Sequence, residues 1–107
     1  MRQLSAQSLH EWLADQSRTQ PFLLDVREPW EYEYCRIQDS LLVPMSQVSG
    51  RLADLHAEAD VVVICHHGVR SFHVASFLEQ QGFGKVYNLQ GGVDAWARQV
   101  EPTMRKY

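Results

Sequence analysis

The segment 61–71 constrains the fold of this chain more than any other. It begins with a continuous apolar run, Val61–Cys65, which is typical of a strand buried on both faces of a sheet. A short loop containing Gly68 follows, and at Arg70 the pattern changes to apolar residues at helical spacing. A strand that leads through a tight loop into a helix brings backbone N–H groups and the positive helix end to one point. We expect Cys65 to lie at that point.

This setting favours the thiolate form of Cys65. Inward N–H groups, the helix N-terminus and the Arg70 cation each stabilise negative charge on the sulfur. The segment therefore predicts a nucleophile inside an anion-binding loop. The alternative is an unreactive cysteine at the end of a core strand, which would need neither the glycine loop nor the arginine.

Strand and helix patterns alternate along the whole chain. We expect strands at 2–4, 22–26, 41–43, 61–65 and 86–89, and helices at 6–16, 29–34, 46–55, 70–81 and 93–99. Gly50 weakens the prediction for 46–55 because glycine disfavours a helix interior. This alternation indicates an α/β architecture with a mainly parallel sheet and 61–65 as its central strand. Functional sites in such sheets form at the carboxyl ends of strands, where Asp25 and Cys65 lie.

Composition sets the limits of the interpretation. The 107 residues, 45% of them hydrophobic, fit one domain spanning 1–107. A net charge of −3 predicts no nucleic-acid partner, because no basic field extends over the molecule. No run is apolar enough to cross a membrane and no signal-peptide pattern is present, so we expect a cytoplasmic protein or a piece of a larger one. The two cysteines form no disulfide pattern.

Three blocks of sequence occur in a fixed order. They are 23–28 with Glu31-Tyr32, then 63–71, and then Gly82-Phe83 with 86–96. Together they resemble the single-domain rhodanese family of thiosulfate sulfurtransferases, and the resemblance covers nearly all of the chain. It implies a three-layer α/β/α fold with a five-stranded, mainly parallel sheet, which agrees with the alternating patterns.

The resemblance also implies a reaction. Cys65 would attack the outer sulfur of thiosulfate, or the sulfane sulfur of a persulfide donor. With thiosulfate, sulfite would leave, and cyanide or a thiol would then remove the sulfur from the Cys65 persulfide. The expected substrate-binding residues are those of the loop, His66, His67, Gly68, Val69, Arg70 and Ser71. Their N–H groups would hold the persulfide charge, and Arg70 would bind the sulfonate end of the donor. No cofactor is expected.

The length of the loop separates this reaction from phosphate chemistry. Four residues lie between Cys65 and Arg70, whereas a related group of phosphatases has one more and so forms a bowl wide enough for phosphate. The loop also lacks a carboxylate that could protonate a leaving group. Two alternatives stay open. One is a sulfur-relay module that serves a protein partner, and the other is a phosphatase or an enzyme like arsenate reductase.

Other polar residues near the blocks are interpreted as support for the site. Asp25, Arg27 and Glu31 are expected to brace neighbouring loops by hydrogen bonds and ion pairs. His66 and His67 are predicted not to bind a metal, because adjacent side chains point apart and no further ligand lies at a suitable spacing.

The sequence departs from the family at 35–40. Members typically have Gly-His-Ile-x-Gly-Ala there, whereas this chain has Cys-Arg-Ile-Gln-Asp-Ser. Asp39 tolerates the positive φ that a glycine often supplies. Arg36 would add positive charge if this loop faces the pocket, and Cys35 is either a resolving thiol for the persulfide or a space-filling residue. The polar segment 100–107 is expected to run over the surface.

Overall fold

One parallel sheet organises the molecule. A computed structural model describes residues 1–107. Its strands are β1 (Arg2–Leu4), β2 (Phe22–Asp25), β3 (Leu41–Leu42), β4 (Val61–Ile64) and β5 (Val86–Leu89), in the order β1-β5-β4-β2-β3. Every neighbouring pair is parallel. The most apolar strand, β4, is central as predicted, because a strand paired on both sides and covered on both faces has no position for a solvated side chain.

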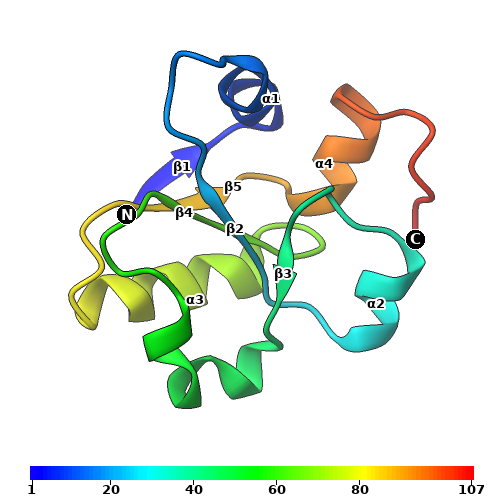
Figure 1. The fold of residues 1–107 in the computed structure, drawn as a ribbon. Helices are drawn as coiled ribbons and strands as arrows, with labels where there is room; N and C mark the ends of the chain where they lie inside the picture. Colours follow the sequence, from blue (N-terminus) through cyan, green and yellow to red (C-terminus); the bar gives the residue numbers. More distant parts are fainter.

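Helices cover both faces of this sheet (Figure 1). On one face lie α1 (Ala6–Ala14) and α4 (Gly92–Gln99), and on the other lie α3 (Val69–Gln80) and two 3₁₀ helices, η1 (Met45–Gly50) and η2 (Leu52–Asp54). The short α2 (Pro29–Tyr34) follows β2. The three-layer α/β/α prediction is therefore confirmed. No helix is both long enough and apolar enough to span a membrane.

The two faces have separate cores, and β4 contributes to both. Val61, Val63 and Cys65 pack into the core on the α3 side, while Val62 and Ile64 pack into the core shared with α1 and α4. This is the alternation of side chains expected along a strand. Cys65 thus leaves the strand on the side where α3 begins.

The helix predicted over 46–55 is wrong. Two separate 3₁₀ helices occupy this segment, and Arg51 stands between them with φ of −128°. Gly50, which disfavours a continuous helix, is the last residue of η1. Two short turns still bury Val48 and Leu55, so the core contacts that the pattern indicated are made without an α-helix.

Two further segments test the sequence predictions locally. Asp39 has a φ of +67°, which confirms the expected left-handed conformation in the segment that departs from the family. The segment 100–107 does not simply run over the surface: it buries Met104 and returns alongside α2 (Figure 1). There the Tyr34 hydroxyl donates to the carbonyl of Lys106, and the Tyr34 and Tyr107 rings meet edge to face.

Candidate active site

The sulfur of Cys65 lies at the bottom of the loop between β4 and α3. The residue is 0% exposed. Its Sγ accepts hydrogen bonds from the backbone N–H of Gly68 at 3.0 Å and of Ser71 at 3.4 Å, and the Ser71 hydroxyl lies 3.2 Å away. Donors at these distances stabilise negative charge on sulfur. Of the six loop residues predicted to surround the sulfur, these two supply the direct hydrogen bonds.

Gly68 makes the tight loop possible. It has a φ of +97° and occupies the N-cap position of α3 in the left-handed conformation. A Cβ at this position would lie 3.1 Å from the Gly91 nitrogen and 3.3 Å from the Leu89 carbonyl oxygen. Both the backbone conformation and the close approach therefore require glycine.

Asn88, a residue that the sequence analysis missed, braces the loop from β5. Its side-chain amide donates to the carbonyl of Gly68 at 3.1 Å, and its carbonyl oxygen accepts from the Ser71 hydroxyl. Asn88 is buried. A buried polar residue inside an apolar strand needs partners, and this is the signal that could have placed it beside the site.

The first turn of α4 anchors the residues at the start of the loop. The N–H of Val93 donates to the Cys65 carbonyl at 2.9 Å, and the N–H of Asp94 donates to the His66 carbonyl at 3.1 Å. Gly92 permits this approach, since a Cβ there would lie 2.3 Å from the Cys65 oxygen. The helix therefore binds these two carbonyl groups, while N–H groups of the same loop contact the sulfur.

Arg70 lies at the rim of the loop and is bound by Glu31 of α2. Its two terminal nitrogens contact the two carboxylate oxygens at 2.7 and 2.9 Å, an arrangement in which both charges are paired. The Arg70 side chain is 34% exposed and that of Glu31 is 5% exposed. Arg70 lowers the pKa of Glu31 to about 2, against the opposing effect of burial, so this carboxylate is charged at neutral pH.

A second ion pair, Asp25 with Arg27, lies fully inside the molecule. Arg27 donates to both carboxylate oxygens, with the shortest contact at 2.8 Å, and both side chains are 0% exposed. Its remaining N–H groups reach the carbonyls of Cys35 at 2.6 Å and Glu31 at 3.3 Å. Of the three residues predicted to support the site, Asp25 and Arg27 thus pair with each other, while Glu31 pairs with Arg70 of the loop.

Tyr107 closes this network, although the sequence analysis gave it no role. Its hydroxyl donates to Glu31 at 2.7 Å and accepts from Arg27 at 2.9 Å. Its ring stacks on that of His66, with centroids 3.7 Å apart and an angle of 10° between the planes. Burial is the main cause that raises the pKa of the phenol above its usual range. No spacing or motif in the sequence points to this residue.

His66 and His67 do not point apart as the sequence analysis assumed. Their rings lie face to face at 3.9 Å, and Asp94 lies near enough for the three side chains to form a candidate metal-ligand group. Ring nitrogens bind a metal in the plane of the ring, however, and two rings tilted by only 30° do not direct their lone pairs to one ion. Asp94 is also paired with Arg98 at 3.0 Å. Burial, followed by the neighbouring His67, lowers the pKa of His66.

Neither Cys35 nor Arg36 is a hydrogen-bond partner of the Cys65 sulfur. Cys35 is a free, half-buried cysteine that packs against the core of α1 and α4, whereas Cys65 packs into the opposite core. Its Sγ lies 3.8 Å from a guanidinium nitrogen of Arg27. Arg36 is exposed and its guanidinium lies 4.8 Å from the centre of the Tyr32 ring.

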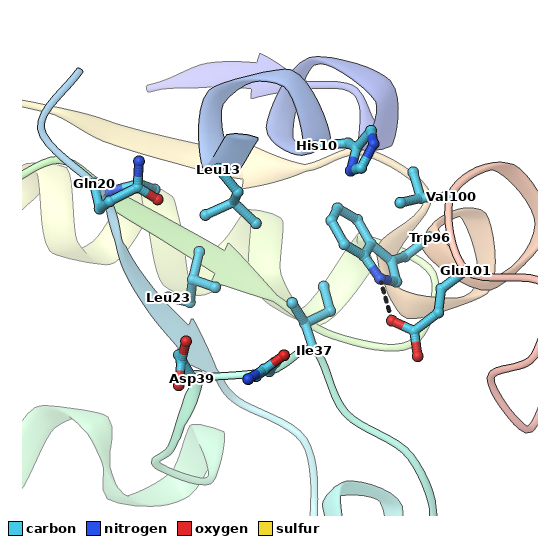
Figure 2. Close-up of a pocket in the computed structure, with 11 residues that line it drawn as sticks. His10, Leu13, Gln20, Leu23, Ile37, Asp39, Trp96, Val100 and Glu101 are labelled. Carbon is cyan, nitrogen blue, oxygen red and sulfur yellow. Dashed lines mark hydrogen bonds between the residues drawn. The ribbon is translucent and has the colours of Figure 1, made fainter. Parts of the chain in front are cut away.

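The largest cavity is elsewhere. It has a volume of about 510 Å³ and lies between α1, β2 and α4, where Leu13, Leu23 and Trp96 line it (Figure 2). Asp39 and Glu101 also face this space (Figure 2). Cys65 lines none of the cavities, so the thiol is enclosed by its own loop in this structure.

The chain belongs to the Rhodanese-like domain family, which matches residues 5–99. A "Sulfurtransferase" from Allochromatium vinosum is 37% identical over 102 residues, covering 95% of this chain and 94% of the relative. A "Thiosulfate sulfurtransferase GlpE" from Actinobacillus pleuropneumoniae is 38% identical over 85 residues, covering 79% of each. The family assignment made from the three blocks is confirmed, and sulfur transfer is supported as the class of reaction.

A solved structure shows the same fold. The rhodanese-related protein from Thermoplasma volcanium is 31% identical, superposes with a TM-score of 0.83, and covers 95% of this chain and 96% of its own. The five-stranded parallel sheet predicted from the resemblance is therefore confirmed.

Proposed function

We propose that this chain transfers sulfane sulfur through a persulfide on Cys65, with thiosulfate as a usable donor and cyanide or a thiol as acceptor. The observation that carries the proposal is the pair of N–H groups, Gly68 and Ser71, that converge on the Cys65 sulfur at the end of the central strand. The membership of the chain in the Rhodanese-like family and the names of its relatives agree with it.

In the first step the Cys65 thiolate attacks the outer sulfur of thiosulfate. A new S–S bond forms, the bond between the two donor sulfurs breaks, and sulfite leaves with its electron pair. In the second step cyanide or a thiolate attacks the outer sulfur of the persulfide and regenerates the Cys65 thiolate. The N–H groups of Gly68 and Ser71 would stabilise the anionic sulfur in both steps.

Arg70 is the proposed anion-binding group at the rim. It is the loop's only cation, and it is partly exposed beside a sulfur that is fully buried. In this structure both of its terminal nitrogens contact Glu31, so an anionic donor that binds both nitrogens would take the place of that carboxylate. Guanidinium groups bind planar or tetrahedral oxyanions through two parallel hydrogen bonds, which suits a sulfonate.

A protein acceptor is the second candidate, in agreement with a sulfur-relay role. Val69 and Phe72 flank Arg70 at the start of α3, and they are 66% and 41% exposed. Apolar side chains beside a transfer site suit the docking of a protein better than that of a small ion. Such a partner would receive the sulfur from the same Cys65 persulfide.

Intact mass spectrometry tests the proposal. After incubation with thiosulfate the native protein should gain one sulfur atom, and added cyanide should remove it. Cys65→Ser should gain nothing, while Cys35→Ser should behave like the native protein and so serves as the matched control. No gain on a thiol that alkylates readily, together with hydrolysis of an aryl phosphate, would overturn sulfur transfer in favour of phosphatase chemistry.

A further inference from the structure

Glu31 has more donors than its ion pair with Arg70 requires. One oxygen accepts from Arg70 and also from the backbone N–H of Glu28 at 2.9 Å. The other accepts from Arg70 and also from the Tyr107 hydroxyl at 2.7 Å. Each oxygen therefore has one donor that remains when Arg70 moves away.

This matters because Glu31 is buried. A carboxylate that is only 5% exposed cannot turn to water when its cation leaves, and an unpaired buried charge is strongly unfavourable. Under the proposed function, a donor that binds both terminal nitrogens of Arg70 takes the place of Glu31. The donors that stay behind on Glu31 therefore set how easily Arg70 becomes available.

The environment of Tyr107 fixes the direction of its hydrogen bond. Its oxygen accepts from Arg27 at 2.9 Å, and a guanidinium can only donate. The phenolic proton is thus directed to Glu31. The stacking of the ring on His66 and its edge contact with Trp30 hold the hydroxyl in place.

We propose that Tyr107 is a positioning residue for this site, whose hydroxyl stabilises Glu31 after Arg70 has left it and so releases Arg70 to bind an anionic sulfur donor. The proposal rests on the proposed function for the identity of the donor, but not for the exchange of partners at Glu31. Tyr107 does not touch the reacting atoms. It acts through Glu31 on the availability of Arg70.

The substitution Tyr107→Phe removes the hydroxyl and keeps the ring that stacks on His66. Tyr34→Phe is the matched control, because it makes the same change in a ring that contacts Tyr107 while its own hydroxyl reaches only the carbonyl of Lys106. In single-turnover persulfide formation, we expect Tyr107→Phe to raise the half-saturating thiosulfate concentration about tenfold. The maximal rate should stay within about twofold, since no contact to the reacting sulfur is lost.

A second measurement does not depend on sulfur transfer. The rates of Cys65 alkylation by iodoacetate and by uncharged iodoacetamide, followed by peptide mass, give a ratio that reports anion binding beside the thiol. Both reagents need the same access to the buried sulfur, so differences in access cancel. We expect this ratio to fall at least about threefold in Tyr107→Phe and to stay unchanged in Tyr34→Phe.

An unchanged ratio in Tyr107→Phe would overturn the inference, and so would an equal fall in both variants, because the second result would reflect packing of the segment 100–107. A lower maximal rate with unchanged thiosulfate saturation would also contradict it. If thiosulfate left no sulfur on any variant, the proposed function would fail, while the alkylation ratio would still decide the role of Tyr107.

Discussion

The two guanidinium–carboxylate pairs near Cys65 differ in burial more than in geometry. Asp25 and Arg27 are both fully buried, and Arg27 also binds the backbone of α2 and Cys35. In the other pair, Glu31 is nearly buried while Arg70 is one-third exposed. Both arginines contact both oxygens of their carboxylates at normal distances.

The difference indicates a division of roles. An ion pair with no exposed atom and no spare donor cannot exchange partners, so Asp25 and Arg27 serve to hold α2 against the sheet. A pair that is open on the cation's side can exchange its carboxylate for an incoming anion. Four predictions test this division, in order of decreasing effect.

Breaking the buried pair should cost the most stability. We expect Arg27→Met to lower the free energy of unfolding by about 3 to 5 kcal/mol, because it leaves the Asp25 carboxylate buried without its cation. Urea denaturation followed by circular dichroism measures this change. A loss below about 1 kcal/mol, typical of exposed pairs, would contradict the assigned difference between the two pairs.

Breaking the partly exposed pair should affect activity instead. We expect Arg70→Ala to lower kcat/KM for thiosulfate by about 100-fold to 1000-fold, as for the loss of one preorganised anion-binding group. The free energy of unfolding should fall by only about 1 kcal/mol, since Glu31 keeps the donors Glu28 and Tyr107. Steady-state kinetics and urea denaturation on one preparation give both values. Unchanged kinetics would remove Arg70 from donor binding.

The pair of Glu31 and Arg70 also predicts how stability depends on pH: the free energy of unfolding should fall at acid pH, and this falling part of the curve is its acid limb. Because the pKa of Glu31 is lowered to about 2 in the folded state, the unfolded chain binds a proton first as the pH falls. The contribution of Glu31 is therefore complete above about pH 4.5 and is lost between there and about pH 2; it amounts to about 3 kcal/mol, shared among the three donors Arg70, the Glu28 N–H and Tyr107. Unfolding free energies measured against pH should show a flatter acid limb for Glu31→Gln than for the native protein. Equal slopes for the two proteins at acid pH would contradict the lowered pKa of Glu31.

A surface pair completes the comparison with the smallest effect. Arg98 and Asp94 on α4 lie 3.0 Å apart, but the Arg98 side chain is 63% exposed. We expect Arg98→Ala to change the unfolding free energy by less than about 0.5 kcal/mol, because water and ions screen this pair. Thermal unfolding and thiosulfate kinetics should both match the native protein. A clear loss of activity would mean that Asp94, next to the loop, needs its partner.

The local parts of the site were predictable from the sequence. The strand, the glycine loop and the following helix lie within one segment, so the position of Cys65 and the need for Gly68 follow from spacing and backbone conformation. The parallel sheet follows in the same way from the alternation of short apolar strands with helices.

The side-chain network was not predictable to the same extent. It joins the end of β2, α2, the start of α3 and the segment 100–107. Nothing in the local patterns of these regions specifies that Tyr107 meets Glu31. Asn88 was detectable only as a polar residue in an apolar strand. The helix predicted over 46–55 failed because apolar spacing fixes which side chains are buried, while Gly50 and Arg51 decide the backbone between them.

The hydrogen bonds between the first turn of α4 and the loop after β4 limit how the site can change. Because Val93 and Asp94 bind the carbonyls of Cys65 and His66, and Gly92 admits no side chain there, the start of the loop is fastened to a helix far along the chain. Adding a residue to the loop would therefore require α4 to move as well. The width of the bowl, and with it the choice between one sulfur atom and a whole phosphate group, is a joint property of two distant segments that would have to vary together.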